Sequence, residues 1–233
     1  KQNWSTWREA GTAARGDGCT YEELDVWARF AYKIAMRKAD ERDEWLAQGR
    51  SGGIRRRRLT KPLRMIVTGG AGSGKSTTIR ALVRARREKT EQRSTLARGV
   101  RDDKRKQARM KYTCILSSPT GAASCQMKYG ATTAHRAWGV SPFNFVPLKK
   151  SNPAVKRLQE MMELGELAVS GEFSMLGKAF IGKVVYRARE VSPGEEASLG
   201  GLDCIMAGHA AQATPIGDDA FFKPCLLYTS PSP

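Results

Sequence analysis

The stretch that decides the fold is LRMIVTGGAGSGKSTTIRAL, which covers residues 63–82. Its apolar run at residues 65–67 is bounded by glycines and predicts a short buried strand. A glycine-rich segment follows and ends at Lys75 and Ser76, after which apolar residues recur at helical spacing. Strand, glycine loop and helix form the context in which the pattern G-x-x-x-x-G-K-[ST] binds phosphate.

The glycine loop has the chemistry of a phosphate site. Glycines let successive backbone N–H groups turn inward as an anion nest, and the following helix adds the positive end of its dipole. The pattern predicts that Lys75 reaches the β- and γ-phosphates and that the Ser76 hydroxyl ligates Mg²⁺. The strand before the loop and the helix after it disfavour the alternative, a glycine-rich turn that matches the pattern by chance. The residues expected to bind ATP and Mg²⁺ are Gly70, Ala71, Gly72, Ser73, Gly74, Lys75, Ser76 and Thr77.

The composition limits the class of protein. The chain has 233 residues, 40% of them hydrophobic, which suits one large domain or one and a half. Its formal net charge of +17 favours a polyanion partner, with nucleic acid first, although a basic protein made soluble by its charge is the alternative. No apolar run of about 18 residues and no signal segment is present. We expect an intracellular protein with no membrane partner, nuclear or mitochondrial if eukaryotic and cytoplasmic if bacterial.

The cysteines are odd in number and scattered. They are Cys19, Cys114, Cys125, Cys204 and Cys225, and no two of them form a C-x-x-C pair. We interpret the cysteines as reduced thiols, which belong to neither a disulfide framework nor a zinc site.

Hydrophobic periodicity predicts alternating helices and strands. The apolar face expected for a helix at residues 21–46 consists of Leu24, Trp27, Phe30, Ala31, Ile34 and Ala35. The strands are expected at residues 65–67, 112–116, 167–169 and 202–207, and later helices at 154–164 and 178–190. Because strands and helices alternate, we predict an α/β fold with a mainly parallel sheet.

Shifts in composition predict the domain boundaries. We expect an N-terminal helical region at residues 1–53, the α/β domain at 54–224 and an unstructured Ser/Pro-rich tail at 225–233. The basic stretch at 84–111 predicts an exposed helix extension and a mobile loop. A solvated insertion is slightly favoured there over a specific site. The basic run at 55–58 is equally consistent with a phosphate contact and a solvated linker.

Four blocks in a fixed order extend the phosphate loop into a family pattern. After the loop come SPTGAA (118–123) with GATTAH (130–135), then GEFSM (171–175), and last GGL (200–202) with GHAAQATP (208–215). In order and spacing these blocks resemble the first motor domain of the Pif-one/RecD-like superfamily 1 DNA helicases. The resemblance covers about residues 63–218, with a weaker match at 21–49. It implies a RecA-like P-loop NTPase domain with helices on both faces of its sheet.

The resemblance assigns roles to single residues. Lys75 matches the phosphate-binding lysine. Ser76 and Glu172 match the residues that hold Mg²⁺, and Glu172 also polarises the attacking water. Gln212 matches the glutamine that senses the γ-phosphate. The positions implied to lie along single-stranded DNA are Thr120, Gly121, Thr133 and His135, for which an ordinary turn and a partly buried histidine are the alternatives.

The chain departs from the family pattern at its acidic positions. Gly171 stands where the pattern has the Asp that helps to hold Mg²⁺, and His209 stands where the fourth block has an Asp. Residues 213–214 replace Leu-Pro, and the adenine-contacting glutamine is not evident near residues 27–29. These departures favour the alternative of a degenerate, non-hydrolysing nucleotide and DNA binder.

The resemblance implies an ATP-dependent DNA helicase. Such a motor couples ATP hydrolysis to 5′-to-3′ translocation on single-stranded DNA and unwinds duplex and forked DNA. It acts in DNA repair, recombination, the DNA-damage response, and telomere or genome maintenance. A second motor domain supplies an arginine finger, and residues 219–233 are too few to form it, so we expect a fragment. A P-loop kinase is a further alternative, against which residues 119–123 and Gln212 argue.

Overall fold

The computed structural model describes residues 20–47, 61–96, 103–149, 151–192, 198–210 and 212–220. Its centre is a five-stranded sheet in the order β1-β5-β4-β2-β3, and each pair of neighbouring strands is parallel. The strands are β1 (Arg64–Thr68), β2 (Cys114–Ser118), β3 (Thr132–Thr133), β4 (Leu167–Ser170) and β5 (Asp203–Gly208). The predicted α/β class with a parallel sheet is therefore confirmed.

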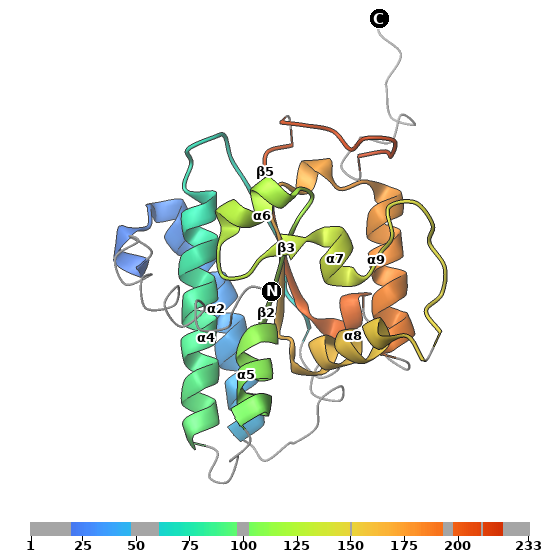
Figure 1. Cartoon of the computed structure of the whole chain (residues 1–233). Helices are drawn as coiled ribbons and strands as arrows, with labels where there is room; N and C mark the ends of the chain where they lie inside the picture. The colour runs from blue at the N-terminus through green and yellow to red at the C-terminus, as the bar shows by residue number, and fades with distance from the viewer. Residues whose placement is uncertain are drawn as a thin grey trace, which may run out of the picture.

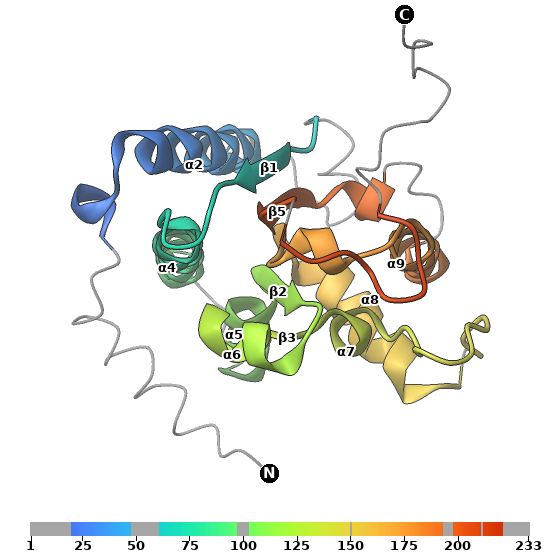
Figure 2. The same ribbon diagram turned by 90° about the horizontal axis from the view of Figure 1, so that it is seen from above.

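Helices cover both faces of the sheet (Figures 1 and 2). The α-helices are α2 (Val26–Ala47), α4 (Lys75–Leu96), α5 (Asp103–Tyr112), α6 (Gly121–Met127), α7 (Ala134–Trp138), α8 (Pro153–Leu164) and α9 (Lys178–Val191). Short 3-10 turns are η2 (Tyr21–Glu23), η3 (Phe173–Met175) and η4 (Ser198–Gly201). In this described part of the chain, no helix has the length and apolarity needed to cross a bilayer.

Two hydrophobic cores form because successive strand residues point to opposite faces. On one face, Leu116 and Val169 pack against α2 and α4 through Ala35 and Val83. On the other face, α8 and α9 pack against alternate positions of the same strands, including Ala168. The apolar residues 114–116 suit β2, which is buried on both faces, and the two serines at its end are buried as well.

The edge strand β1 departs from the prediction of a buried strand. Its Ile66 side chain is 55% exposed, and its neighbours Met65 and Val67 are only half-buried. β1 pairs with β5 alone among the described strands, so it has the sheet on one side only. The strand was located correctly from the glycines that follow it. The burial that was predicted from its apolar composition was wrong.

Three further element predictions need correction. The second strand begins at Cys114, because Tyr112 still belongs to α5. The two-residue strand β3 was not predicted. Of the apolar face predicted for the first helix, Leu24 and Ala35 are buried, but Trp27 is 81% and Phe30 61% exposed. The side of α2 that faces the protein also carries Ala28, Ala39 and Arg42.

The basic stretch at residues 84–111 contains the predicted helix extension, but this extension is not exposed throughout. Helix α4 continues through it to Leu96, and Arg86 and Thr90 on this helix are 0% and 1% exposed. Helix α5 begins at Asp103 within the same stretch. The intervening residues 97–102, the basic run at 55–58 and the expected tail at 225–233 lie outside the described residues.

Arg86 belongs to a buried ionic cluster at the amino ends of the strands, which we call the arginine cluster (Arg42, Arg86, Arg93, Glu166 and Asp203). The first residue of β5, Asp203, accepts hydrogen bonds from Arg42 at 3.1 Å and Arg86 at 3.3 Å. Its second oxygen accepts the Leu63 backbone N–H at 2.9 Å. These bonds join α2, α4, β1 and β5 at one point.

Glu166, just before β4, completes the arginine cluster. Its carboxylate lies 2.9 Å from Arg93 and 3.6 Å from Arg42. Arg93 also pairs with Asp43 of α2 at 2.9 Å. Because buried charges need both ion partners and hydrogen bonds, this cluster fixes α2 and α4 on the sheet. It thereby also fixes the start of α4, which lies at the carboxyl edge of the sheet.

Candidate nucleotide-binding site

The phosphate loop joins β1 to α4 at the carboxyl edge of the sheet. Its backbone takes positive φ angles of 77° at Gly72 and 76° at Gly74, a region that residues with a Cβ adopt at a cost. Gly69 has a different reason to be glycine, since a Cβ there would lie 2.5 Å from the Ser73 hydroxyl. The Thr78 N–H donates to the Gly74 carbonyl at 2.9 Å and begins α4.

The Lys75 side chain folds back over this loop. Its ammonium donates to the carbonyls of Gly69 and Gly70, both at 2.7 Å, and lies 3.4 Å from the Ser73 hydroxyl. Backbone carbonyls carry only partial negative charge, so a phosphate group is a stronger partner for the same ammonium. The lysine is thus held over the loop by contacts that a phosphate can replace.

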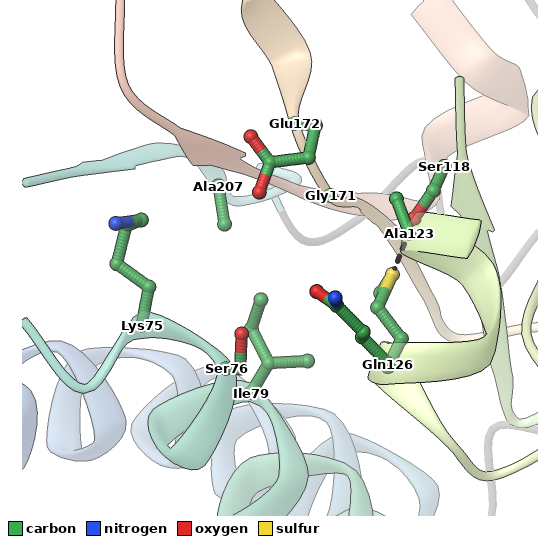
Figure 3. A pocket seen from close by; sticks show the side chains of 10 residues that line it. Lys75, Ser76, Ile79, Ser118, Ala123, Gln126, Gly171, Glu172 and Ala207 are labelled. Atoms are coloured by element: carbon green, nitrogen blue, oxygen red, sulfur yellow. Dashed lines mark hydrogen bonds between the residues drawn. The ribbon is translucent and has the colours of Figure 1, made fainter. Parts of the chain in front are cut away.

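A hollow beside the loop gathers several of the predicted residues (Figure 3). It has a volume of about 340 Å³, open mouth included, and lies between α4, α6 and the ends of β4 and β5. Its lining consists of Lys75, Ser76, Ile79, Ser118, Ala123, Gln126, Met127, Gly171, Glu172 and Ala207. The structure therefore places Lys75, Ser76 and Glu172 around one space.

Glu172 is held in an unusual conformation. Its φ and ψ of 50° and 47° are left-handed, which costs an L-residue on the order of 1–2 kcal/mol. A Cβ on Gly208 of β5 would meet the Phe173 nitrogen at 2.9 Å and the Glu172 Cα at 3.2 Å. The bare backbone of β5 thus lets this turn approach closely. Within the described residues, the buried Oε2 of Glu172 has no hydrogen-bond partner.

The space beside Gly171 is filled. A Cβ built on Gly171 would lie 2.9 Å from both the Met127 sulfur and the Ser118 hydroxyl oxygen. The Ser118 hydroxyl itself donates to the Met127 sulfur at 2.8 Å. An aspartate side chain at this position would therefore have to displace the end of the Met127 side chain and the serine hydroxyl.

The residues of the hollow fit a nucleotide-bound Mg²⁺. Among the described residues, no group of three or more His, Cys, Asp and Glu side chains is arranged to hold a metal. Mg²⁺ in nucleotide sites needs no such cage, because it keeps several waters and takes one or two protein oxygens together with the phosphates. The Ser76 hydroxyl and the unpartnered Glu172 oxygen are suitable oxygens, and both line the hollow.

Gln212 is not among the residues that line the hollow. Its side chain is exposed, and its backbone N–H donates to the His209 carbonyl at 3.1 Å in the segment after β5. The neighbouring residue 211 lies outside the described part of the chain. Gln212 thus follows a strand that ends beside the site, without contributing to its lining.

The four predicted DNA residues lie at or just after the carboxyl ends of two neighbouring strands. β2 pairs with β3 through Ser118 and Thr133, so the segments after both strands start from one edge. Thr120 caps α6 by accepting the Ala123 N–H at 3.2 Å, and Thr133 caps α7 by accepting the Arg136 N–H at 3.4 Å. Gly121 is the exposed first residue of α6. Both threonines therefore have a structural role as helix caps.

His135 is partly covered by α9. Its ring lies 4.6 Å from the Phe180 ring, centroid to centroid. Burial, followed by the charge of Lys183, lowers the pKa of His135 below its ordinary value of 6.5. This is the partly buried histidine that the sequence left open as the alternative to a DNA contact.

Comparison with known proteins identifies the family. A family profile described as an AAA domain matches residues 56–187, which is more than half of the 233 residues. The chain belongs to this AAA domain family. Together with the parallel sheet and the phosphate loop, this AAA domain membership confirms the predicted α/β P-loop NTPase fold.

Solved structures similar to this AAA domain include Pif1 helicases, the class that its sequence blocks resemble. Bacteroides Pif1 bound to ssDNA is 25% identical, with a TM-score of 0.47, over 71% of this chain and 33% of that chain. Bacteroides Pif1 in complex with ADP-AlF3 and ssDNA is 22% identical, with a TM-score of 0.46, over 76% and 33%. Candida albicans Pif1 is 17% identical, with a TM-score of 0.45, over 72% and 34%. The chain thus spans about a third of the length of these helicases, and no curated protein matches it.

Sequence reasoning assigned no role in the site to several residues that line the AAA domain's hollow, among them Ser118, Gln126 and Met127. Ser118 ends β2, and the other two lie in the last turn of α6. The available signal was the parallel sheet itself, since the carboxyl ends of neighbouring strands meet at one edge and the helix after each strand begins there.

Proposed function

We propose that this AAA domain is the first motor domain of a Pif-one/RecD-like ATP-dependent DNA helicase. One observation carries the proposal: the phosphate-loop residues Lys75 and Ser76 meet the unpartnered Glu172 carboxylate around one hollow. A carboxylate that is left without a partner beside a phosphate loop is suited to orient water and metal next to a γ-phosphate. The order and spacing of the four sequence blocks make a DNA motor the best-supported member of this class.

In this proposal, ATP binding exchanges the contacts of Lys75. The ammonium leaves the carbonyls of Gly69 and Gly70 for the β- and γ-phosphates, while the loop N–H groups bind the phosphate oxygens. The Ser76 hydroxyl would hold Mg²⁺, which when bound would offset the negative charge of the phosphates. Glu172 accepts a hydrogen bond from the attacking water, and Gln212 is proposed to sense the γ-phosphate.

Single-stranded DNA is the proposed polymer partner. It would cross the carboxyl edge at Thr120, Gly121, Thr133 and His135, and the net charge of +17 would attract its phosphates. Translocation and the unwinding of forked DNA need a second motor domain with an arginine finger, which belongs to the proposed whole helicase. DNA repair and recombination are the processes proposed for that helicase.

A degenerate nucleotide and DNA binder is the second candidate. The filled space beside Gly171 favours it, because the side chain of Met127 and the Ser118 hydroxyl stand where an aspartate would need room. Nucleotide binding survives in this candidate, since the phosphate loop is complete. Only hydrolysis is lost.

DNA binding is tested by fluorescence anisotropy with an oligothymidine strand at several salt concentrations. Contact with a few nucleotides should give a slope of log affinity against log salt of roughly −2 to −3. Thr120→Asp retains an oxygen for the α6 cap but places a carboxylate on the proposed path, so it should weaken binding at least about tenfold. Asn152→Asp changes the cap of α8 in the same way and should leave binding nearly unchanged. Equal affinity of Thr120→Asp and the parent would contradict this path.

ATP turnover measured with and without the oligothymidine strand distinguishes the candidate functions. Turnover that DNA stimulates supports the motor, and nucleotide binding with no turnover in a chain joined to a second motor domain supports the degenerate binder. Phosphoryl transfer to a small molecule, indifferent to DNA, would instead support the kinase alternative. The 233 residues alone should not displace a DNA strand, and clear ATP-dependent displacement would contradict the proposed need for a second domain.

A further inference from the structure

Gln126 is the polar side chain that enters the hollow from α6. It lines the same space as Lys75, Ser76 and Glu172, and Figure 3 shows its amide turned into that space, toward the α4 side. The residue is exposed, and no hydrogen bond of its side chain to another described residue is present. Its two neighbours in the lining, Ala123 and Met127, carry no oxygen in their side chains.

The opposite wall cannot provide a second carboxylate. Gly171 has no side chain, and the space beside it is occupied by Met127 and the Ser118 hydroxyl. Among the described residues that line this hollow, Glu172 alone has a side chain with a full negative charge. A Mg²⁺ held there would therefore need another oxygen to accept hydrogen bonds from its bound water.

We propose that the Gln126 amide oxygen takes this place and accepts a hydrogen bond from the water shell of the nucleotide-bound Mg²⁺. An amide oxygen is an acceptor with two lone pairs, so it can orient a metal-bound water, although it lacks the charge of a carboxylate. The site would then keep the metal-positioning contact while losing one negative charge. This inference rests on the proposed nucleotide binding and assigns Gln126 as a positioning residue of that site.

The test compares binding of the analogue adenylyl imidodiphosphate with Mg²⁺ and with EDTA, by calorimetry on the full chain. The ratio of the two affinities is the measured quantity, because Lys75 and the loop act in both conditions. Gln126→Ala should reduce this ratio about tenfold, the lower end of the range for groups that support a metal indirectly, and should leave binding in EDTA unchanged. Gln159→Ala, at an exposed site on α8, is the control and should change neither affinity.

A second variant guards against a folding defect. Gln126→Glu keeps the shape of the side chain and adds a charge that favours Mg²⁺, so its affinity ratio should equal or exceed that of the parent. A parental ratio in Gln126→Ala, or a reduced ratio in Gln126→Glu, would overturn the role of Gln126 and leave the proposed function standing. Absence of analogue binding by the parent in both conditions would overturn the proposed function, and this inference with it.

Discussion

Asp203 and Glu172, at opposite edges of the sheet, differ in their hydrogen bonding. At the amino edge, Asp203 is bonded to Arg42, Arg86 and the Leu63 N–H, and it is 1% exposed. At the carboxyl edge, the buried Oε2 of Glu172 has no hydrogen-bond partner among the described residues. The fully paired acid stabilises the fold, whereas the unpaired acid is left free to bind something else. This difference agrees with the general rule that ligand sites in open α/β sheets lie at the carboxyl ends of the strands.

Left-handed backbone occurs at both edges of the sheet. It is found at Leu199, Gly200 and Gly201 just before β5, and at Gly72, Gly74 and Glu172 in the site. Strain at a functional site persists only where the surrounding structure imposes it. From the difference in pairing, we expect substitutions of charged side chains at the amino edge to change stability and those of charged side chains at the carboxyl edge to change chemistry.

The largest effect on stability should come from Asp203→Ala. It leaves Arg42 and Arg86 buried without their shared carboxylate, so the free energy of unfolding should fall by about 3–5 kcal/mol. Urea unfolding followed by circular dichroism measures the change. Glu88→Ala removes the partner of Arg84 in an exposed pair on α4 and should cost no more than about 0.5 kcal/mol. Equal losses in the two variants would remove the contrast between the edges.

Gly208→Ala should have the next largest effect. Its Cβ would press on the backbone of Phe173 and Glu172, and overpacking of this kind costs about 1–3 kcal/mol. Gly182 on α9 is the matched control, because a Cβ there meets nothing within 4 Å. Gly182→Ala should stabilise the helix by roughly 0.5–1 kcal/mol. Thermal melts of both variants measure these changes. A melting temperature of Gly208→Ala above that of the parent would contradict the close approach of the Glu172–Phe173 backbone to β5.

Glu172→Gly should separate stability from chemistry. Glycine adopts the left-handed conformation without the Cβ cost, so the variant should be as stable as the parent or up to about 1 kcal/mol more stable. The same change removes the carboxylate proposed to orient water and should abolish ATP turnover in a chain joined to a second motor domain. A large loss of stability would mean that Glu172 has a structural role like that of Asp203.

The smallest effect concerns His135 and pH. Burial and Lys183 lower its pKa in the folded state, so below pH 6.5 the unfolded chain binds more protons than the folded chain. The free energy of unfolding should therefore fall as pH drops through this range, and His135→Gln should flatten that fall. Urea midpoints at several pH values around 6 test this. An unchanged slope in the variant would show that the histidine is not held neutral by α9.

The sequence predicted the phosphate loop and most of the strands because both signals are local. A strand of apolar residues followed by glycines and Lys75 needs no knowledge of distant contacts. Strand β3 escaped prediction because two residues are too few to show a period. The apolar face predicted for α2 was only partly right, because the buried Arg42 pairs with Asp203 and gives no hydrophobic signal.

Contacts distant in sequence decide the rest of the site. The family pattern located Gly171, but only the structure shows that Met127 and Ser118 occupy the space beside it. In the same way, Gln126 has no local pattern that marks it, and its position in the hollow follows from the packing of α6 beside β4 and α4. Arg86 is similar, since a basic stretch on a helix predicts exposure until its buried partner is known.

The central claim is that the carboxyl edge binds nucleotide through Lys75. Titration calorimetry of ADP with Mg²⁺ into the parent and Lys75→Ala tests it most directly, with circular dichroism to show that both are folded. Removal of the ammonium that faces the phosphates should weaken binding at least about tenfold while the urea midpoint stays near that of the parent. Equal affinity in a folded Lys75→Ala variant would contradict the assignment of this edge as the nucleotide site.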